Sequence, residues 1–148
     1  TAWQRGIAPI GVGVFKPHGH SVSRPVNHSF TNHADWGEGK FLVMRTTFVV
    51  TNLTCDYYRL SVLANKGFHI YLNGQEIQTY IWWQDVPFYR TIMLAGKEAQ
   101  LLKHGTNTLA VYTVAAYDKT HAPVGQIDVF IEGLKKEGLG MVLAEQRR

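Results

Sequence analysis

The sequence predicts an all-β fold, a sandwich of two packed antiparallel sheets, and three observations lead to this prediction. Short runs rich in β-branched and aromatic residues alternate apolar with polar positions, and turn signals separate them. The sequence lacks both an internal repeat and the alternation of strands with long helices that a parallel sheet requires. The chain has 148 residues, which suffices for one domain whose core needs no disulfide or metal.

The first part of the chain, residues 1–35, is predicted to wrap irregularly around the same domain. It is rich in Gly, Pro and His and shows little periodicity, so we expect at most a short strand around Ile10 to Phe15. The next segment, Phe41 to Thr51 (FLVMRTTFVVT), is apolar at positions of both parities. This pattern predicts a central strand.

Two strands with one buried face each are predicted next, joined to a third by a tight turn. The apolar positions of the first are Tyr58, Leu60, Val62 and Ala64. Those of the second are Phe68, Ile70 and Leu72, which alternate with His69 and Tyr71. The pair Asn73-Gly74 favours a type I′ turn, because both central positions need positive φ. We therefore expect the chain to reverse into a strand over Gln75 to Ile81.

The second half of the chain predicts further strands and one short helix. Thr91 to Leu94 is typical of a strand, and Lys97 to Lys103 could form about two helical turns before Gly105. Asn107 to Tyr117 and the segment around Ile127 to Glu132 alternate as strands do.

Residues 36–134 are predicted to form the sandwich, with 1–35 as a wrap of the same domain. Residues 135–148 are a charged tail that could be a helix, a linker or disordered. We expect the shared core to contain Leu60, Val62, Phe68, Ile70, Leu72, Leu109, Val111, Ile127 and Val129.

Three segments carry a resemblance to a known family, and they are FLVMRTTF (41–48), GFHIYLNGQEI (67–77) and LLKHGTNTLAV (101–111). Their order and spacing resemble the galactose-binding-like jelly roll found beside the catalytic domains of β-galactosidase-like and α-rhamnosidase-like glycosidases. His104 and Thr106 depart from the family pattern, where Pro and Glu are frequent.

The resemblance spans about residues 36–134 and implies a jelly-roll β-sandwich. It also implies a non-catalytic accessory domain of a secreted glycoside hydrolase-associated protein, extracellular or periplasmic. Such domains either bind carbohydrate or pack as scaffolding against a neighbouring catalytic domain, so two functions stay open.

An aromatic segment is the candidate carbohydrate-binding site. Aromatic faces dock the C–H faces of sugar rings, and amide or carboxylate groups bind the hydroxyls. The candidate residues are Tyr80, Trp82, Trp83, Gln84, Asp85 and Tyr89. Adjacent residues of an extended chain point to opposite sides, so Trp82 and Trp83 are not both expected in the core. The alternative is that the segment packs against the wrap or a partner domain.

Catalytic and metal chemistry lack a recognisable pattern in the sequence. Cys55 has no activating base nearby in sequence, and the Gly-x-Ser-x-Gly elbow of hydrolases does not occur. Four histidines crowd the first part of the chain near Asp35, in spacings that match no metal motif; they are His18, His20, His28 and His33. His69 and His121 have no evident partner in the sequence and are expected at the surface. We therefore predict no enzyme activity, no cofactor and no metal site.

The charge pattern bears on partners. The formal net charge is +4, yet Lys and Arg are scattered, and nucleic acid usually needs a basic face. No apolar run in the sequence is long enough to span a bilayer. We therefore expect neither nucleic acid nor membrane as a partner, and a domain that is monomeric when isolated.

Overall fold

The computed structural model describes residues 5–12, 34–37, 40–64, 66–81, 89–117 and 123–136. Strands dominate these ranges, and their one helix has four residues, so the predicted all-β class is confirmed. Within the same ranges, no helix has the length and apolar character required to cross a membrane. In chain order the elements are β1 (Ile10–Val12), β2 (Ala34–Asp35), β3 (Phe41–Val50), β4 (Tyr57–Ala64), β5 (Phe68–Leu72), β6 (Gln75–Tyr80), β7 (Tyr89–Leu94), α1 (Lys97–Gln100), β8 (Gly105–Val114), β9 (Ala116–Tyr117) and β10 (Pro123–Leu134).

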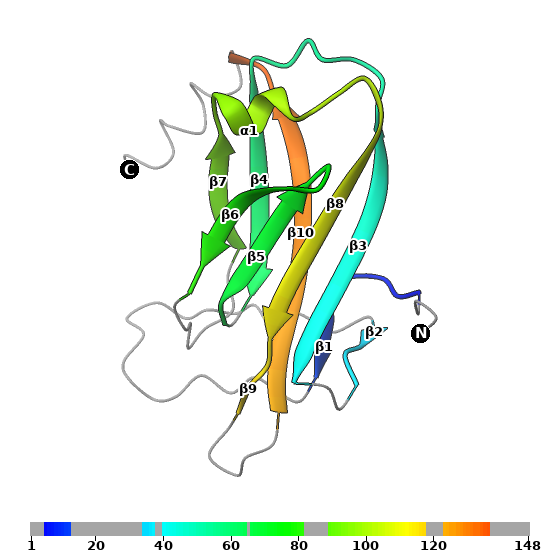
Figure 1. Cartoon of the computed structure of the whole chain (residues 1–148), viewed down its shortest axis with the longest axis vertical. Helices are drawn as coiled ribbons and strands as arrows, with labels where there is room; N and C mark the ends of the chain where they lie inside the picture. The colour runs from blue at the N-terminus through cyan, green and yellow to red at the C-terminus, as the bar shows by residue number, and fades with distance from the viewer. Residues whose placement is uncertain are drawn as a thin grey trace.

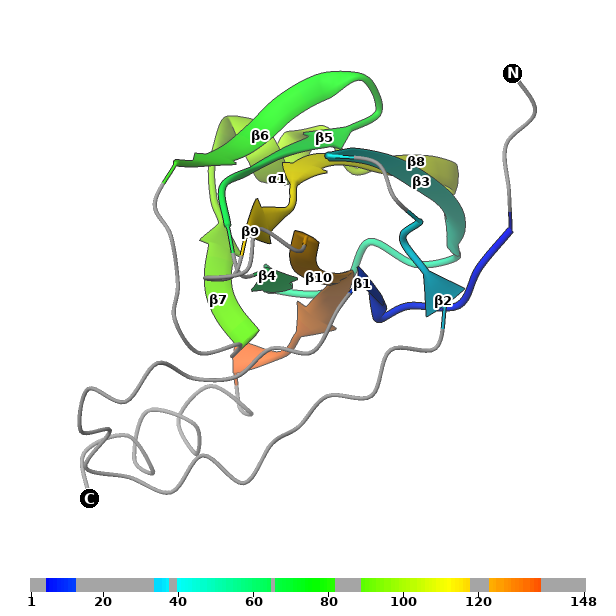
Figure 2. The ribbon, with the colours of Figure 1, turned by 90° about the horizontal axis from the view of Figure 1, so that it is seen from below.

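The strands form two sheets that pack face to face, as the predicted sandwich requires (Figure 1; Figure 2). The large sheet has the order β2-β1-β10-β4-β7, with β9 paired to β10, and the small sheet has the order β3-β8-β5-β6. Neighbouring strands run antiparallel except for the short pair β1 and β2, which is parallel. Figure 2 shows the two layers with β6 and β7 at one edge and β3 and β1 toward the other.

The core lies between the two sheets and contains the predicted residues. Eight of the nine are buried, and Val129 is partly buried and packs against them. Trp36 joins this core with only 8% of its surface exposed. Its indole lies so close to Gly125 of β10 that a Cβ there would be 2.7 Å from the ring. A glycine at this position therefore makes room for the tryptophan.

The hairpin prediction is confirmed. Asn73 and Gly74 have φ values of 50° and 83°, as a type I′ turn requires, and the chain reverses between β5 and β6. The N–H of Asn73 also donates to the carbonyl of Thr108 at 2.8 Å, so the turn is attached to β8.

Two strand predictions were wrong in detail. β3 is an edge strand of the small sheet, not a central one. Its outward face carries apolar side chains that are exposed, namely Phe41, Val43 and Val49, so apolar residues on both faces did not mean burial on both. β4 was expected to bury one face, but Ser61 and Leu63 on its other face are also buried.

The helix is shorter than predicted, and the strand predicted from Asn107 to Tyr117 is divided in two. α1 makes one turn, because the backbone N–H and C=O of Lys103 pair with the side chain of Asn107 at 3.1 and 2.8 Å. The segment expected as one strand from Asn107 to Tyr117 is β8 and β9, separated at Ala115. The N–H of Ala115 donates to the carbonyl of Lys40 at 2.9 Å.

Candidate functional site

Two of the six residues of the predicted carbohydrate site lie in the described part of the chain, at the ends of strands in different sheets. Tyr80 is the last residue of β6 in the small sheet, and Tyr89 is the first of β7 in the large sheet. The other four candidates, Trp82, Trp83, Gln84 and Asp85, lie outside the described residues, as do the four N-terminal histidines. Asp35, near which those histidines were expected, accepts a hydrogen bond from the N–H of Gly37 at 2.9 Å.

Tyr80 connects the edge strands of the two sheets. Its ring stacks on Phe68 with centroids 5.6 Å apart, and the guanidinium carbon of Arg90 lies 4.0 Å from its centroid. Nη2 of Arg90 also donates to the Tyr80 hydroxyl at 2.8 Å. Since Arg90 belongs to β7, this pair holds β6 and β7 together where the connecting segment begins.

Tyr89 lies on the outer face of the large sheet. Tyr89 of β7 is directly opposite Leu63 of β4, and Leu63 is directly opposite Asp128 of β10. The Tyr89 hydroxyl donates a short hydrogen bond to Oδ2 of Asp128, and its ring packs on Phe130 with centroids 5.5 Å apart. Burial, and then the hydrogen bond to Asp128, raise the pKa of Tyr89, so the phenol stays a donor.

The structure therefore does not bring Tyr80 and Tyr89 onto one surface. Tyr80 packs on the core residue Phe68, whereas Tyr89 faces outward across the other layer. Each is engaged by a partner from a different strand, Arg90 or Asp128. Together they fix the two ends of the segment that holds the tryptophans.

A second group of polar and aromatic side chains occupies the outer face of the small sheet. Nδ1 of His69 is 3.0 Å from Oε2 of Glu76, and the Thr79 hydroxyl donates to Oε1 of the same carboxylate at 2.6 Å. The Thr79 hydroxyl is also 3.3 Å from Nδ1 of His69. Hydrogen bonds from Thr79 and then His69 lower the pKa of Glu76, so the carboxylate is ionised at neutral pH. Hydrogen bonding to Glu76 also raises the pKa of Tyr71.

Aromatic rings continue this group across the sheet. Tyr112 of β8 contacts His69 with centroids 5.9 Å apart, and on its other side it stacks with Phe41 of β3 at 5.9 Å. The ammonium of Lys40 lies 5.9 Å from the Phe41 centroid. We call the set Phe41, Tyr112, His69, Glu76 and Thr79 the outer-face row.

Sequence reasoning missed the outer-face row because His69 had no partner nearby in sequence. The signal was the Asn73-Gly74 turn, because a two-residue hairpin loop sets Tyr71 opposite Glu76. That pairing alone brings a carboxylate to the face on which His69 lies.

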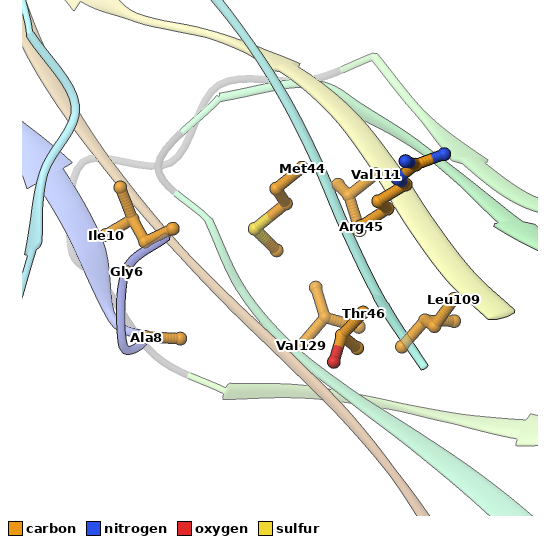
Figure 3. A pocket seen from close by; sticks show the side chains of 9 residues that line it. All are labelled: Gly6, Ala8, Ile10, Met44, Arg45, Thr46, Leu109, Val111 and Val129. Carbon is orange, nitrogen blue, oxygen red and sulfur yellow. The ribbon is translucent and has the colours of Figure 1, made fainter. Parts of the chain in front are cut away.

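A pocket of about 240 Å³ opens between the sheets on the β3 side (Figure 3). Its walls come from the N-terminal segment, β3, β8 and β10, and most are apolar, including Ile10, Met44 and Val129. Thr46 contributes a hydroxyl, whereas the guanidinium of Arg45 points away from the cavity in Figure 3. A sugar site needs several converging polar groups, so this lining suits an apolar group better.

The described part of the chain does not gather metal-ligating side chains. In those ranges no three His, Cys, Asp or Glu side chains lie close enough together to hold an ion. His69 and Glu76 form a hydrogen-bonded contact on the sheet surface.

Comparisons with known proteins give similarity only among solved structures. No known protein-family profile matches the chain, and no curated protein matches it either. A native α-L-rhamnosidase from Aspergillus terreus is similar over 78% of this chain and 14% of its own, with 16% identity and a TM-score of 0.48. A PA14 sugar-binding domain from an RTX adhesin is similar over 69% of this chain and 49% of its own, with 16% identity and a TM-score of 0.35. The chain thus spans less than half the length of either protein.

Proposed function

We propose that the chain is a non-catalytic carbohydrate-binding module of a larger carbohydrate-active protein, extracellular or periplasmic. The observation that carries the proposal is the anchoring of the aromatic segment at both ends. Arg90 holds Tyr80 before the segment, and Asp128 holds Tyr89 after it. The segment between them carries Trp82, Trp83, Gln84 and Asp85, which have the composition of a sugar site.

Anchored ends favour binding because fixed positions at both ends of the segment reduce the conformational entropy lost on binding a ligand. The two anchors belong to different sheets, Tyr80 to the edge strand β6 and Tyr89 to the edge strand β7. In an extended segment, adjacent tryptophans point to opposite sides, so one indole can pack on the domain while the other stacks on a sugar ring.

The sequence resemblance gives separate support. The segments 41–48, 67–77 and 101–111, which resemble the galactose-binding-like jelly roll, contribute to β3, the β5–β6 hairpin and β8. These strands are the members of the small sheet. The resembling segments thus form one continuous structural unit.

Isothermal titration of the chain against cellohexaose, xylohexaose, mannohexaose and neoagarohexaose tests the proposal. We expect one of Trp82→Ala and Trp83→Ala to weaken binding about tenfold or more, because a stacking platform is lost. Ile81→Ala is the matched control, since Ile81 begins the same segment and is 76% exposed. Absence of binding by the wild type to all four sugars would contradict the proposal. Release of shorter sugars from any of them would contradict the non-catalytic role.

A second candidate function is packing against a neighbouring catalytic domain. Three large apolar side chains are exposed where β3 ends and β4 begins, with exposed fractions of 67% for Val49, 44% for Leu53 and 40% for Tyr57. Exposed apolar groups gathered at one end of a domain are typical of a contact surface. Hydrogen exchange in the parent protein and in the isolated chain separates the two functions, because packing would protect residues 49–57 only in the parent.

A further inference from the structure

A β-bulge in β6 completes the polar end of the outer-face row, because it brings Thr79 to the same face as Glu76. In a regular strand, residues three apart point to opposite faces of the sheet. The register of β5 and β6 shifts between Ile70 and Tyr71, so that Glu76 is opposite Tyr71 and Thr79 is opposite His69. The extra residue is Ile77, which is buried. Glu76 and Thr79 therefore share the outer face, and bulges of this kind re-aim side chains beside binding sites.

The Glu76 carboxylate is held in place by the re-aimed Thr79 and by His69, but it is still accessible. Thr79 and His69 fix its two oxygens, and 46% of the Glu76 side chain remains exposed. A carboxylate oriented by neighbouring groups loses little entropy when it accepts further hydrogen bonds from a ligand. Sugar hydroxyls are donors of the required kind.

The other end of the row supplies an apolar surface. Phe41 is 55% exposed on the edge strand, and Tyr112 connects it to His69. The row crosses every strand of the small sheet from β3 to β6. Three interstrand spacings amount to roughly 14 Å. This span exceeds the width of one pyranose ring, so it fits an oligosaccharide lying across the strands.

We infer that the outer-face row is a second saccharide-binding surface, which takes a neutral oligosaccharide with one ring against Phe41 and another hydrogen-bonded to Glu76. The inference rests on the proposed function, because it assigns a further contact surface to the same carbohydrate-binding module. The uncharged sugar follows from the ionised carboxylate at the polar end, since an anionic sugar would be repelled there.

The test uses the full chain and the same four hexasaccharides. We expect Phe41→Ala to weaken binding about fivefold to tenfold, because an aromatic contact is removed. Glu76→Gln should weaken it about fivefold, because the ligand's hydroxyls lose a charged acceptor. Val49→Ala is the matched control, since Val49 is on the same strand and outer face but outside the row. Melting temperatures equal to that of the wild type would show that the variants fold.

Amide chemical shifts of the wild type give a second measurement that needs no variant. On titration with a hexasaccharide that binds, the shifts should move at Tyr71, Tyr112 and Thr79. A wild type that binds one of the sugars while Phe41→Ala and Glu76→Gln bind it equally well would overturn this inference and leave the proposed function standing. A wild type that binds none of them overturns both.

Discussion

Nδ2 of Asn73 donates a hydrogen bond to Oδ1 of Asn107 at 2.8 Å, which joins the β5–β6 turn to the start of β8. Asn107 is fully buried, and both of its polar atoms are used. Its oxygen also accepts from the N–H of Lys103, and its nitrogen donates to the carbonyls of Lys103 and Gly105. One side chain thus fixes the end of the α1 region, the turn and the strand.

We predict that Asn107→Ala lowers the free energy of unfolding by about 2 to 4 kcal/mol, because several buried polar groups lose their partners. Denaturant titration measures the change. Thr106→Ala, at an exposed neighbouring position, should change stability by less than about 0.5 kcal/mol. Equal effects of the two substitutions would show that the network contributes little.

Gly74→Val should destabilise the domain by roughly 1 kcal/mol or more, because Gly74 has a φ of 83°. No heavy atom lies within 4 Å of a Cβ built there, so backbone strain is the cause and not a clash. Gly74→Asn should cost less, since Asn tolerates positive φ. Chemical denaturation of the three proteins compares these costs, and the turn assignment fails if valine is tolerated as well as asparagine.

The Tyr80–Arg90 pair should show coupling in a double-mutant cycle. Tyr80→Leu and Arg90→Met each remove the cation–π contact and the hydrogen bond between β6 and β7. We expect a coupling free energy of about 1 to 2 kcal/mol from thermal or chemical unfolding. Strictly additive losses would mean that the two side chains stabilise the sheets independently.

The raised pKa of Tyr89 predicts a loss of stability at alkaline pH. Burial and Asp128 favour the neutral phenol in the folded state, whereas the unfolded chain has the ordinary tyrosine pKa of about 10. The contribution of Tyr89 to the free energy of unfolding is therefore complete below about pH 10. It is lost as the pH rises from there toward the pKa of Tyr89 in the folded state. The difference in unfolding free energy between wild type and Tyr89→Phe should shrink between pH 9 and pH 11, by the same linkage. A difference that stays constant over that range would contradict the assigned hydrogen bond.

Local patterns predicted the strands well, but they could not assign neighbours. The alternation in β5 and the Asn73-Gly74 turn depend on nearby residues only, and both are confirmed. Whether β3 is central or at an edge depends on how many strands pair with it. In the described structure its partner is β8, which is distant in sequence. Likewise, the burial of Leu63 depends on residues on the outer face of the large sheet, including Tyr89. The periodicity of a sequence predicts that a strand forms, but it does not predict which other side chains pack over each face of that strand.

The candidate site was predictable only in part for a related reason. Aromatic composition identified the segment from Tyr80 to Tyr89, but its sequence does not reveal that Arg90 and Asp128 engage the two ends. The outer-face row also depends on the extra residue Ile77. Because one residue is inserted there, each later residue of β6 points to the opposite face from the one that a regular hairpin would give it. A regular hairpin register would place His69 opposite Gln78 and not opposite Thr79.

The position of β10 within the large sheet has a consequence for synthesis of the chain. β10 follows every other described strand in sequence, yet it lies between β1 and β4, and Ile10 pairs with Ile127. During translation, β1 and β4 leave the ribosome long before the strand that joins them. The large sheet therefore closes only when residues 123–134 have emerged. Its most distant pairings then form last, as expected for a slow folder with many contacts between distant residues.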